Sequence, residues 1–167
     1  MYRTALFSEK KFPVGRLYED AFTIPDILLG TSKVAATTKR LYYYIRRAES
    51  ITRAPYNEKS MDKIYAFGHV YETVKKNCPQ YEEAALYRLY QAYFSVLDKM
   101  LYVKDYKMLD DYKTVTGFIK EHAFDIRKNE YLGKTRKLSA LALKFGIPFY
   151  RIFWHRCERL KKKPVSC

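Results

Sequence analysis

Apolar residues recur at helical spacing through the last two thirds of the chain. In the segment 58–77 they are Ile64, Phe67, Tyr71 and Val74. Steps of three and four residues place such side chains on one face of a helix. Similar stripes predict further helices over about 80–103, 106–126, 138–145 and 149–162. The pattern therefore predicts a mainly α fold, an antiparallel bundle of about four to five helices.

The first third of the chain has a different pattern. Acidic residues followed by apolar ones predict a helix over 19–29 that ends at Gly30, although Pro25 would kink it or delay its start. β-branched and aromatic residues over 34–38 and 40–46 predict two short strands. We therefore expect a small β element within residues 1–55 and a helical region over 56–167, together forming one compact unit.

The composition is that of a folded domain. The chain has 167 residues, of which 48% are hydrophobic and 17 are tyrosines, enough for a moderate core rich in aromatic rings. Its three cysteines, Cys78, Cys157 and Cys167, show no metal-ligand spacing and are expected to be free thiols in a reducing, cytoplasmic compartment. No apolar run approaches the roughly 18 residues that a membrane-spanning helix needs, so no such helix is predicted.

Positive charge is concentrated towards the C-terminus. The formal net charge is +14, and residues 120–167 hold 13 basic residues against four acidic ones. Such an excess favours an anionic partner: phospholipid, a polyprenyl diphosphate carrier or nucleic acid.

The last predicted helix combines this charge with apolar residues. Phe149, Ile152, Phe153, Cys157 and Leu160 share a broad face, with Trp154 nearby. The residues expected to contact a membrane or another anion are Arg151, Trp154, Arg156, Arg159, Lys161, Lys162 and Lys163. This composition is typical of a helix that lies on an anionic membrane. The alternative is that its rings complete the bundle core and its lysines form a solvated tail.

Two motifs near the N-terminus carry the candidate chemistry. The first follows the pattern F-P-x-G-x-x-Y-E-D and consists of Phe12, Pro13, Gly15, Tyr18, Glu19 and Asp20. The second follows L-Y-x-Y-x-x-R-x-x-S-I-T and consists of Leu41, Tyr42, Tyr44, Arg47, Ser50, Ile51 and Thr52. Both patterns, at this separation, resemble the C-terminal half of family 2 glycosyltransferases of the GT-A type. Glu49 departs from the family, which often has glycine at that position.

The resemblance implies an inverting transfer of a sugar from a nucleotide-sugar to a glycan or lipid-linked acceptor, as in cell-surface polysaccharide biosynthesis. It implies that Asp20 is the catalytic base, which removes the acceptor proton as the oxygen attacks. Glu19 is expected to tune Asp20 through like-charge repulsion. Arg47, Ser50 and Tyr44 would bind the acceptor or the diphosphate. Without the resemblance, two acids in a first helical turn would only complement the macrodipole.

The donor side of such an enzyme is missing from the sequence. There is no D-x-D motif and no glycine-rich phosphate loop, and the three histidines lie on different predicted helices. We therefore expect no metal site and no cofactor in this chain, whereas a complete enzyme would use a divalent metal and a nucleotide-sugar. The N-terminal β element would be a remnant of the GT-A domain. The chain would be inactive alone and would need a donor-site half, a partner chain or a second copy.

Two other function classes stay open. The chain could be a non-catalytic basic module that docks on an anionic membrane, at the inner face, or on a partner chain. It could also bind nucleic acid through Arg40, Arg46, Arg47 and the tyrosines between them. No helix-turn-helix, zinc-finger or RNA-recognition signature supports this last reading, which ranks below the others.

Overall fold

The computed structural model describes residues 2–43, 45 and 54–161. Over these residues the protein is mainly helical, with seven α-helices and four short 3₁₀ turns. The α-helices are α1 (Glu19–Leu29), α2 (Asp62–Asn77), α3 (Glu82–Met100), α4 (Asp111–Glu121), α5 (Ala123–Lys128), α6 (Lys134–Leu143) and α7 (Ile147–Lys161). The 3₁₀ turns are η1 (Thr4–Phe7), η3 (Glu58–Met61), η4 (Pro79–Tyr81) and η5 (Tyr106–Met108). The predicted helical bundle is thus confirmed.

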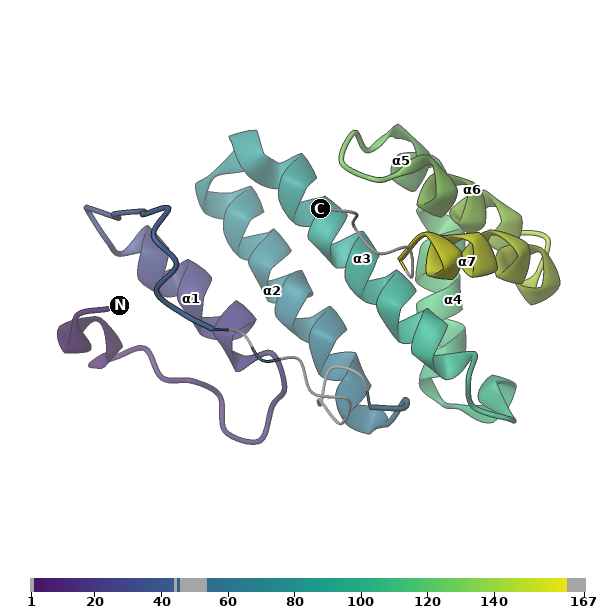
Figure 1. Ribbon diagram of the computed structural model, residues 1–167, viewed down its shortest axis with the longest axis horizontal. Helices are drawn as coiled ribbons and strands as arrows, with labels where there is room; N and C mark the ends of the chain where they lie inside the picture. The colour runs from purple at the N-terminus through teal and green to yellow at the C-terminus, as the bar shows by residue number, and fades with distance from the viewer. Residues whose placement is uncertain (1, 44, 46–53, 162–167) are drawn as a thin grey trace.

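The helices are arranged in a row with a cluster at one end. α1, α2 and α3 lie side by side, and α4 to α7 gather on the far side of α3 (Figure 1). Only the short η4 turn joins α2 to α3, and helices connected so closely pack as antiparallel neighbours. α1 packs mainly against α2, so the N-terminal motif reaches the rest of the bundle through that helix.

The core lies where α3 meets α4, α6 and α7. Its largest fully buried side chains include Phe94, Leu97, Ile119, Leu143 and Tyr150. Aromatic packing also joins α3 to α4, because the rings of Tyr93 and Phe118 stack with centroids 3.7 Å apart and planes 6° from parallel. The tyrosine-rich composition is therefore used for ring packing.

A buried polar cluster crosses this core. Arg136 of α6 forms a bidentate ion pair with Asp98 of α3. The hydroxyl of Tyr150 in α7 donates to Asp98 Oδ1 at 2.7 Å and accepts from Arg136 Nη1 at 3.0 Å. The guanidinium carbon also lies 4.9 Å from the ring centroid of Phe94. Arg136, which the sequence places with the basic surface, is thus a core residue that links three helices.

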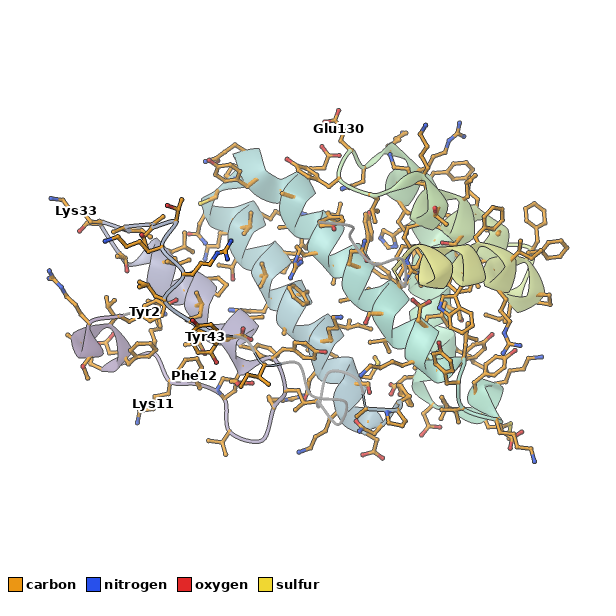
Figure 2. All side chains as sticks on the ribbon, viewed as in Figure 1. Tyr2, Lys11, Phe12, Lys33, Tyr43 and Glu130 are labelled. Atoms are coloured by element: carbon orange, nitrogen blue, oxygen red, sulfur yellow. The ribbon has the colours of Figure 1, made fainter. Side chains whose placement is uncertain are left out.

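The predicted β element is not found in the described residues. Residues 34–38 have no regular secondary structure, and the described part of 40–46 contains no strand. A strand needs a neighbour to take its backbone hydrogen bonds, and its side chains need a face to cover. Val34, Leu41 and Tyr43 are instead exposed, Tyr43 by 93% (Figure 2). A strand-like composition therefore gives a segment without regular structure on the α1 side of the molecule (Figure 1).

The predicted helix over 106–126 is broken into η5, α4 and α5. Leu109 is extended, with φ −68° and ψ 130°, which separates η5 from α4. His122 has φ −89° and ψ 12° and ends α4, while its Nδ1 lies 2.9 Å from the carbonyl oxygen of Phe118. These two backbone departures turn α5 towards α6, against which it packs.

Candidate functional site

The turn that leads into α1 has an unusual backbone. Gly15 has φ 79°, which glycine adopts freely. Tyr18, the N-cap of α1, has φ 62° and ψ 35°, and among the described residues it is the non-glycine residue with a positive φ. The left-handed region costs an L-residue with a Cβ about 1–2 kcal/mol. Other contacts must hold Tyr18 in this conformation, because it is not the intrinsic preference of a bulky side chain.

Asp62 fixes the residues just before Tyr18. This carboxylate is the first residue of α2, is 4% exposed, and accepts hydrogen bonds on both oxygens. Its Oδ1 accepts from Arg16 Nη1 at 2.7 Å, and its Oδ2 accepts from the backbone N–H of Leu17 at 2.9 Å. Charge-assisted bonds of this kind are among the stronger ones in proteins. The start of α1 is therefore anchored to the start of α2.

The ring of Tyr18 also contacts α2. It lies against Phe67 with centroids 6.5 Å apart, and the Lys63 ammonium is 5.7 Å from its centroid. Burial raises the pKa of the Tyr18 phenol, and the negative charge of Asp20 raises it further. Tyr18 therefore stays protonated at neutral pH.

Glu19 and Asp20 occupy the first turn of α1, and both are exposed. Asp20 Oδ1 accepts a hydrogen bond from the backbone N–H of Ala21 at 2.8 Å, which orients the carboxylate. The helix N-terminus stabilises both negative charges. Asp20 is thus an oriented and solvent-accessible carboxylate that can take a proton from a hydroxyl brought to it.

Replacing Asp62 by alanine should destabilise the protein by about 1–3 kcal/mol, because Leu17 and Arg16 both lose their acceptor. Urea unfolding followed by circular dichroism measures this loss. Asp26→Ala is the matched control: Asp26 lies on α1 and is 3.5 Å from His69 Nε2, in a part-exposed pair. Such pairs contribute about 0–1 kcal/mol. Equal losses in the two variants would contradict the anchoring role of Asp62.

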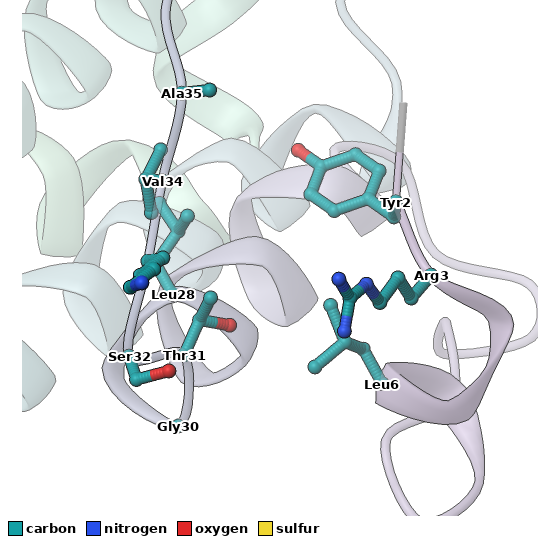
Figure 3. A pocket seen from close by; sticks show the side chains of 10 residues that line it. Tyr2, Arg3, Leu6, Leu28, Gly30, Thr31, Ser32, Val34 and Ala35 are labelled. Atoms are coloured by element: carbon teal, nitrogen blue, oxygen red, sulfur yellow. The ribbon is translucent and has the colours of Figure 1, made fainter.

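A wide pocket lies at the other end of α1. Its volume is about 550 Å³, and Tyr2, Arg3 and Leu6 face Leu28 and the segment after α1 across it (Figure 3). The lining residues are Tyr2, Arg3, Leu6, Leu28, Gly30, Thr31, Ser32, Lys33, Val34 and Ala35. An α-helix of 11 residues is about 16 Å long, so this pocket is remote from Asp20.

A smaller hollow of about 350 Å³ opens beside the anchored turn. Its lining residues are Gly15, Arg16, Glu58, Lys59, Met61, Asp62, Tyr65 and Asp111. The guanidinium carbon of Arg16 lies 5.7 Å from the Tyr65 ring centroid, so a cation and a ring border this space. Glu19 and Asp20 are not among the residues that line this hollow.

Several predicted site residues are not described by the structure. Tyr44, Arg47 and Ser50 lie outside the described residues, and so do Lys162 and Lys163. The same holds for the side chains of Arg156, Arg159 and Lys161. Their predicted roles stay predictions.

Two residues predicted to contact a membrane or an anion do have described surroundings. Trp154 is 4% exposed, and its ring meets Tyr102 edge-on with centroids 5.2 Å apart. It belongs to the core, and the prediction that it contacts a membrane is corrected. Arg151 donates to the carbonyl oxygen of Leu101 at 3.4 Å, and its guanidinium carbon is 5.5 Å from the Tyr106 ring centroid. Part of its side chain is therefore used to hold α7 against the loop after α3.

No group of three or more His, Cys, Asp or Glu side chains in the described part of the chain could hold a metal ion. No helix in that part is long and apolar enough to cross a membrane. No protein-family model matches the chain, and no curated protein or solved structure shows detectable similarity to it.

Proposed function

We propose that this chain is the acceptor-side part of an inverting glycosyltransferase of family 2, with Asp20 as the catalytic base. The motif from Phe12 to Asp20 supports this proposal, and the backbone of Tyr18 carries it furthest. An ordinary helix N-cap residue does not need a left-handed backbone. Residues with strained backbones that are held by buried partners cluster at functional sites. Here the strain directly precedes the exposed carboxylates of Glu19 and Asp20.

The chemistry assigned to this chain is one proton transfer. A hydroxyl of the acceptor lies against Asp20, and its oxygen attacks the anomeric carbon of the donor sugar from the face opposite the leaving group. The bond from that carbon to the nucleoside diphosphate breaks, and its electron pair leaves with the diphosphate. The proton of the hydroxyl passes to the Asp20 carboxylate. Glu19, one residue before, is the second carboxylate in the same first turn of α1.

The donor site is assigned to another part of the enzyme. The described residues contain no group of three or more His, Cys, Asp or Glu side chains that could hold a metal ion, so we assign the metal to the donor half. The nucleotide-sugar, together with any divalent metal, would be held by the donor half. We further propose a cytoplasmic enzyme that lies at the inner face of the membrane, because the chain is strongly basic and its cysteines show no disulfide pattern.

The test is a transfer assay on the polypeptide or complex that joins residues 1–167 to a donor-binding half. It is incubated with a panel of nucleotide-sugars and with glycan or lipid-linked acceptors, and NMR reads the anomeric configuration of the product. We expect transfer with inversion. Retention of configuration, or undiminished transfer by the donor half without residues 1–167, would reject the proposal.

A further inference from the structure

A band of apolar side chains faces outward from α6 and α7. We call this band the α6–α7 patch. It consists of Leu138, Phe145, Phe149 and Ile152, which are between 48% and 77% exposed. A groove of about 390 Å³ runs along it. The groove is lined by Leu138, Leu141, Ala142, Phe145, Phe149 and Phe153. All six lining residues are apolar, so nothing in the groove needs a polar partner.

The residues of this patch do not belong to the core, because other residues of the same two helices fill the core. The inward residues include Ala140 and Leu143 of α6 and Ile147, Tyr150 and Trp154 of α7. Both helices therefore bury one apolar face and expose another. Contiguous exposed apolar surface rimmed by polar groups is typical of an interaction site.

The segment of sequence that carries the patch has charge of one sign. Between residues 131 and 157 the sequence contains no aspartate and no glutamate. Lys134, Lys137 and Lys144 belong to α6 or directly follow it, and none is buried. The ammonium of Lys144 lies 4.4 Å from the ring centroid of Phe124, itself an exposed aromatic residue. A partner must therefore offer negative charge at its surface and an apolar interior.

We propose that the α6–α7 patch docks on an anionic lipid bilayer, with Phe145, Phe149 and Ile152 entering the acyl region and the α6 lysines contacting lipid phosphates. A bilayer supplies negative charge above an apolar layer, in the arrangement that the patch presents. An acidic protein fits less well, because a specific protein or ligand site needs placed polar groups to fix orientation. The groove has none. The proposal concerns binding alone and does not depend on the proposed transfer reaction.

The experiment is co-sedimentation of the purified 167-residue chain with vesicles of pure phosphatidylcholine, or with 30% phosphatidylglycerol added. We expect binding to the anionic vesicles only, and a loss on adding salt. Neutralising Lys134, Lys137 and Lys144 to glutamine should weaken binding about 100-fold, at about 1 kcal/mol for each charge. Phe145→Ser with Phe149→Ser should weaken it at least tenfold.

The charge-matched control replaces Lys10, Lys11 and Lys33 by glutamine. Lys11 and Lys33 lie on the α1 side of the molecule (Figure 2), and all three lysines are exposed. This variant has the same net charge as the α6 variant and should bind vesicles almost as the parent does. Equal weakening by both triple variants would overturn the proposal, because binding would then depend on charge alone.

Two other results would also overturn it. One is binding that the paired phenylalanine variant leaves unchanged. The other is no sedimentation with anionic vesicles together with a gel shift of single-stranded nucleic acid that the α6 lysine variant abolishes. That second result would assign the surface to nucleic acid. All variants change side chains that are exposed or, for Lys137, half-buried. Unchanged circular dichroism and melting temperature confirm that each compared protein is folded.

Discussion

Asp20→Asn should lower the turnover of a transferase that contains this chain by about 10²–10⁴-fold, the usual contribution of a general base. Asparagine has the same shape and can still accept from the Ala21 N–H, at present a 2.8 Å bond. It cannot take up the acceptor proton. Turnover at saturating acceptor is the measurement, and the free energy of unfolding should stay within about 0.5 kcal/mol of the parent because the side chain is exposed.

Asp26→Asn is the matched control for this experiment. Asp26 lies on the same helix, and its carboxylate points to His69 rather than to the N-terminal turn. Its replacement removes the same charge from α1 and should leave turnover nearly unchanged. If Asp20→Asn retains more than about a tenth of the parental turnover, Asp20 is not the base.

Arg136→Met should destabilise the protein by about 3–5 kcal/mol, the usual cost of breaking a buried ion pair from one side. Asp98 would keep its charge in a site where it is only 8% exposed, with the Tyr150 hydroxyl as its remaining partner in the cluster. Urea unfolding gives the free energy directly. The folded fraction at room temperature should also fall, because small domains are stable by only about 5–15 kcal/mol.

The double variant Asp98→Leu with Arg136→Met separates an uncompensated charge from a packing defect. Replacing both partners by apolar residues removes the stranded charge, so most of the lost stability should return. A double variant at least as unstable as Arg136→Met would show that most of the lost stability comes from packing around the guanidinium, including its contact with Phe94. A single variant that loses less than about 1 kcal/mol would contradict the buried pair itself.

Helix positions were largely predictable because their signals are local. The prediction for 19–29 agrees with α1, since acids in its first turn and Gly30 at its end are both visible in the sequence. Pro25 lies inside α1 without ending it. α2 and α3 begin a few residues later than predicted, because η3 and η4 occupy their first turns. The strands over 34–38 and 40–46 were not predictable from composition, since pairing depends on a neighbour that the described residues do not supply.

The inward faces of helices were less predictable. α7 has apolar residues around most of its circumference, so periodicity does not separate Tyr150 and Trp154 from Phe149 and Ile152. The structure buries the first two and exposes the others. The burial of Arg136, one of the 13 basic residues after position 119, is likewise not predictable, because its partner Asp98 lies 38 positions earlier in the sequence.

The candidate site was predictable in part. Glu19 and Asp20 follow from the motif, and the structure places them together at the exposed start of α1. Asp62 was missed, because an acid in the first turn of a helix is expected for the macrodipole alone. Its two hydrogen bonds join residues that are 45 and 46 positions apart in the sequence, and no local sequence pattern predicts such contacts. The left-handed backbone of Tyr18 was also not predictable from the sequence, since tyrosine does not favour that conformation.

The polar cluster of Asp98, Arg136 and Tyr150 has a consequence for how the chain is made. Asp98 belongs to α3, but the groups that compensate its charge belong to α6 and α7, at positions 136 and 150. A nascent chain that ends before these residues would have to bury an uncompensated carboxylate in order to close the core around α3. Completion of that core therefore waits until α6 and α7 have been synthesised and have left the ribosome.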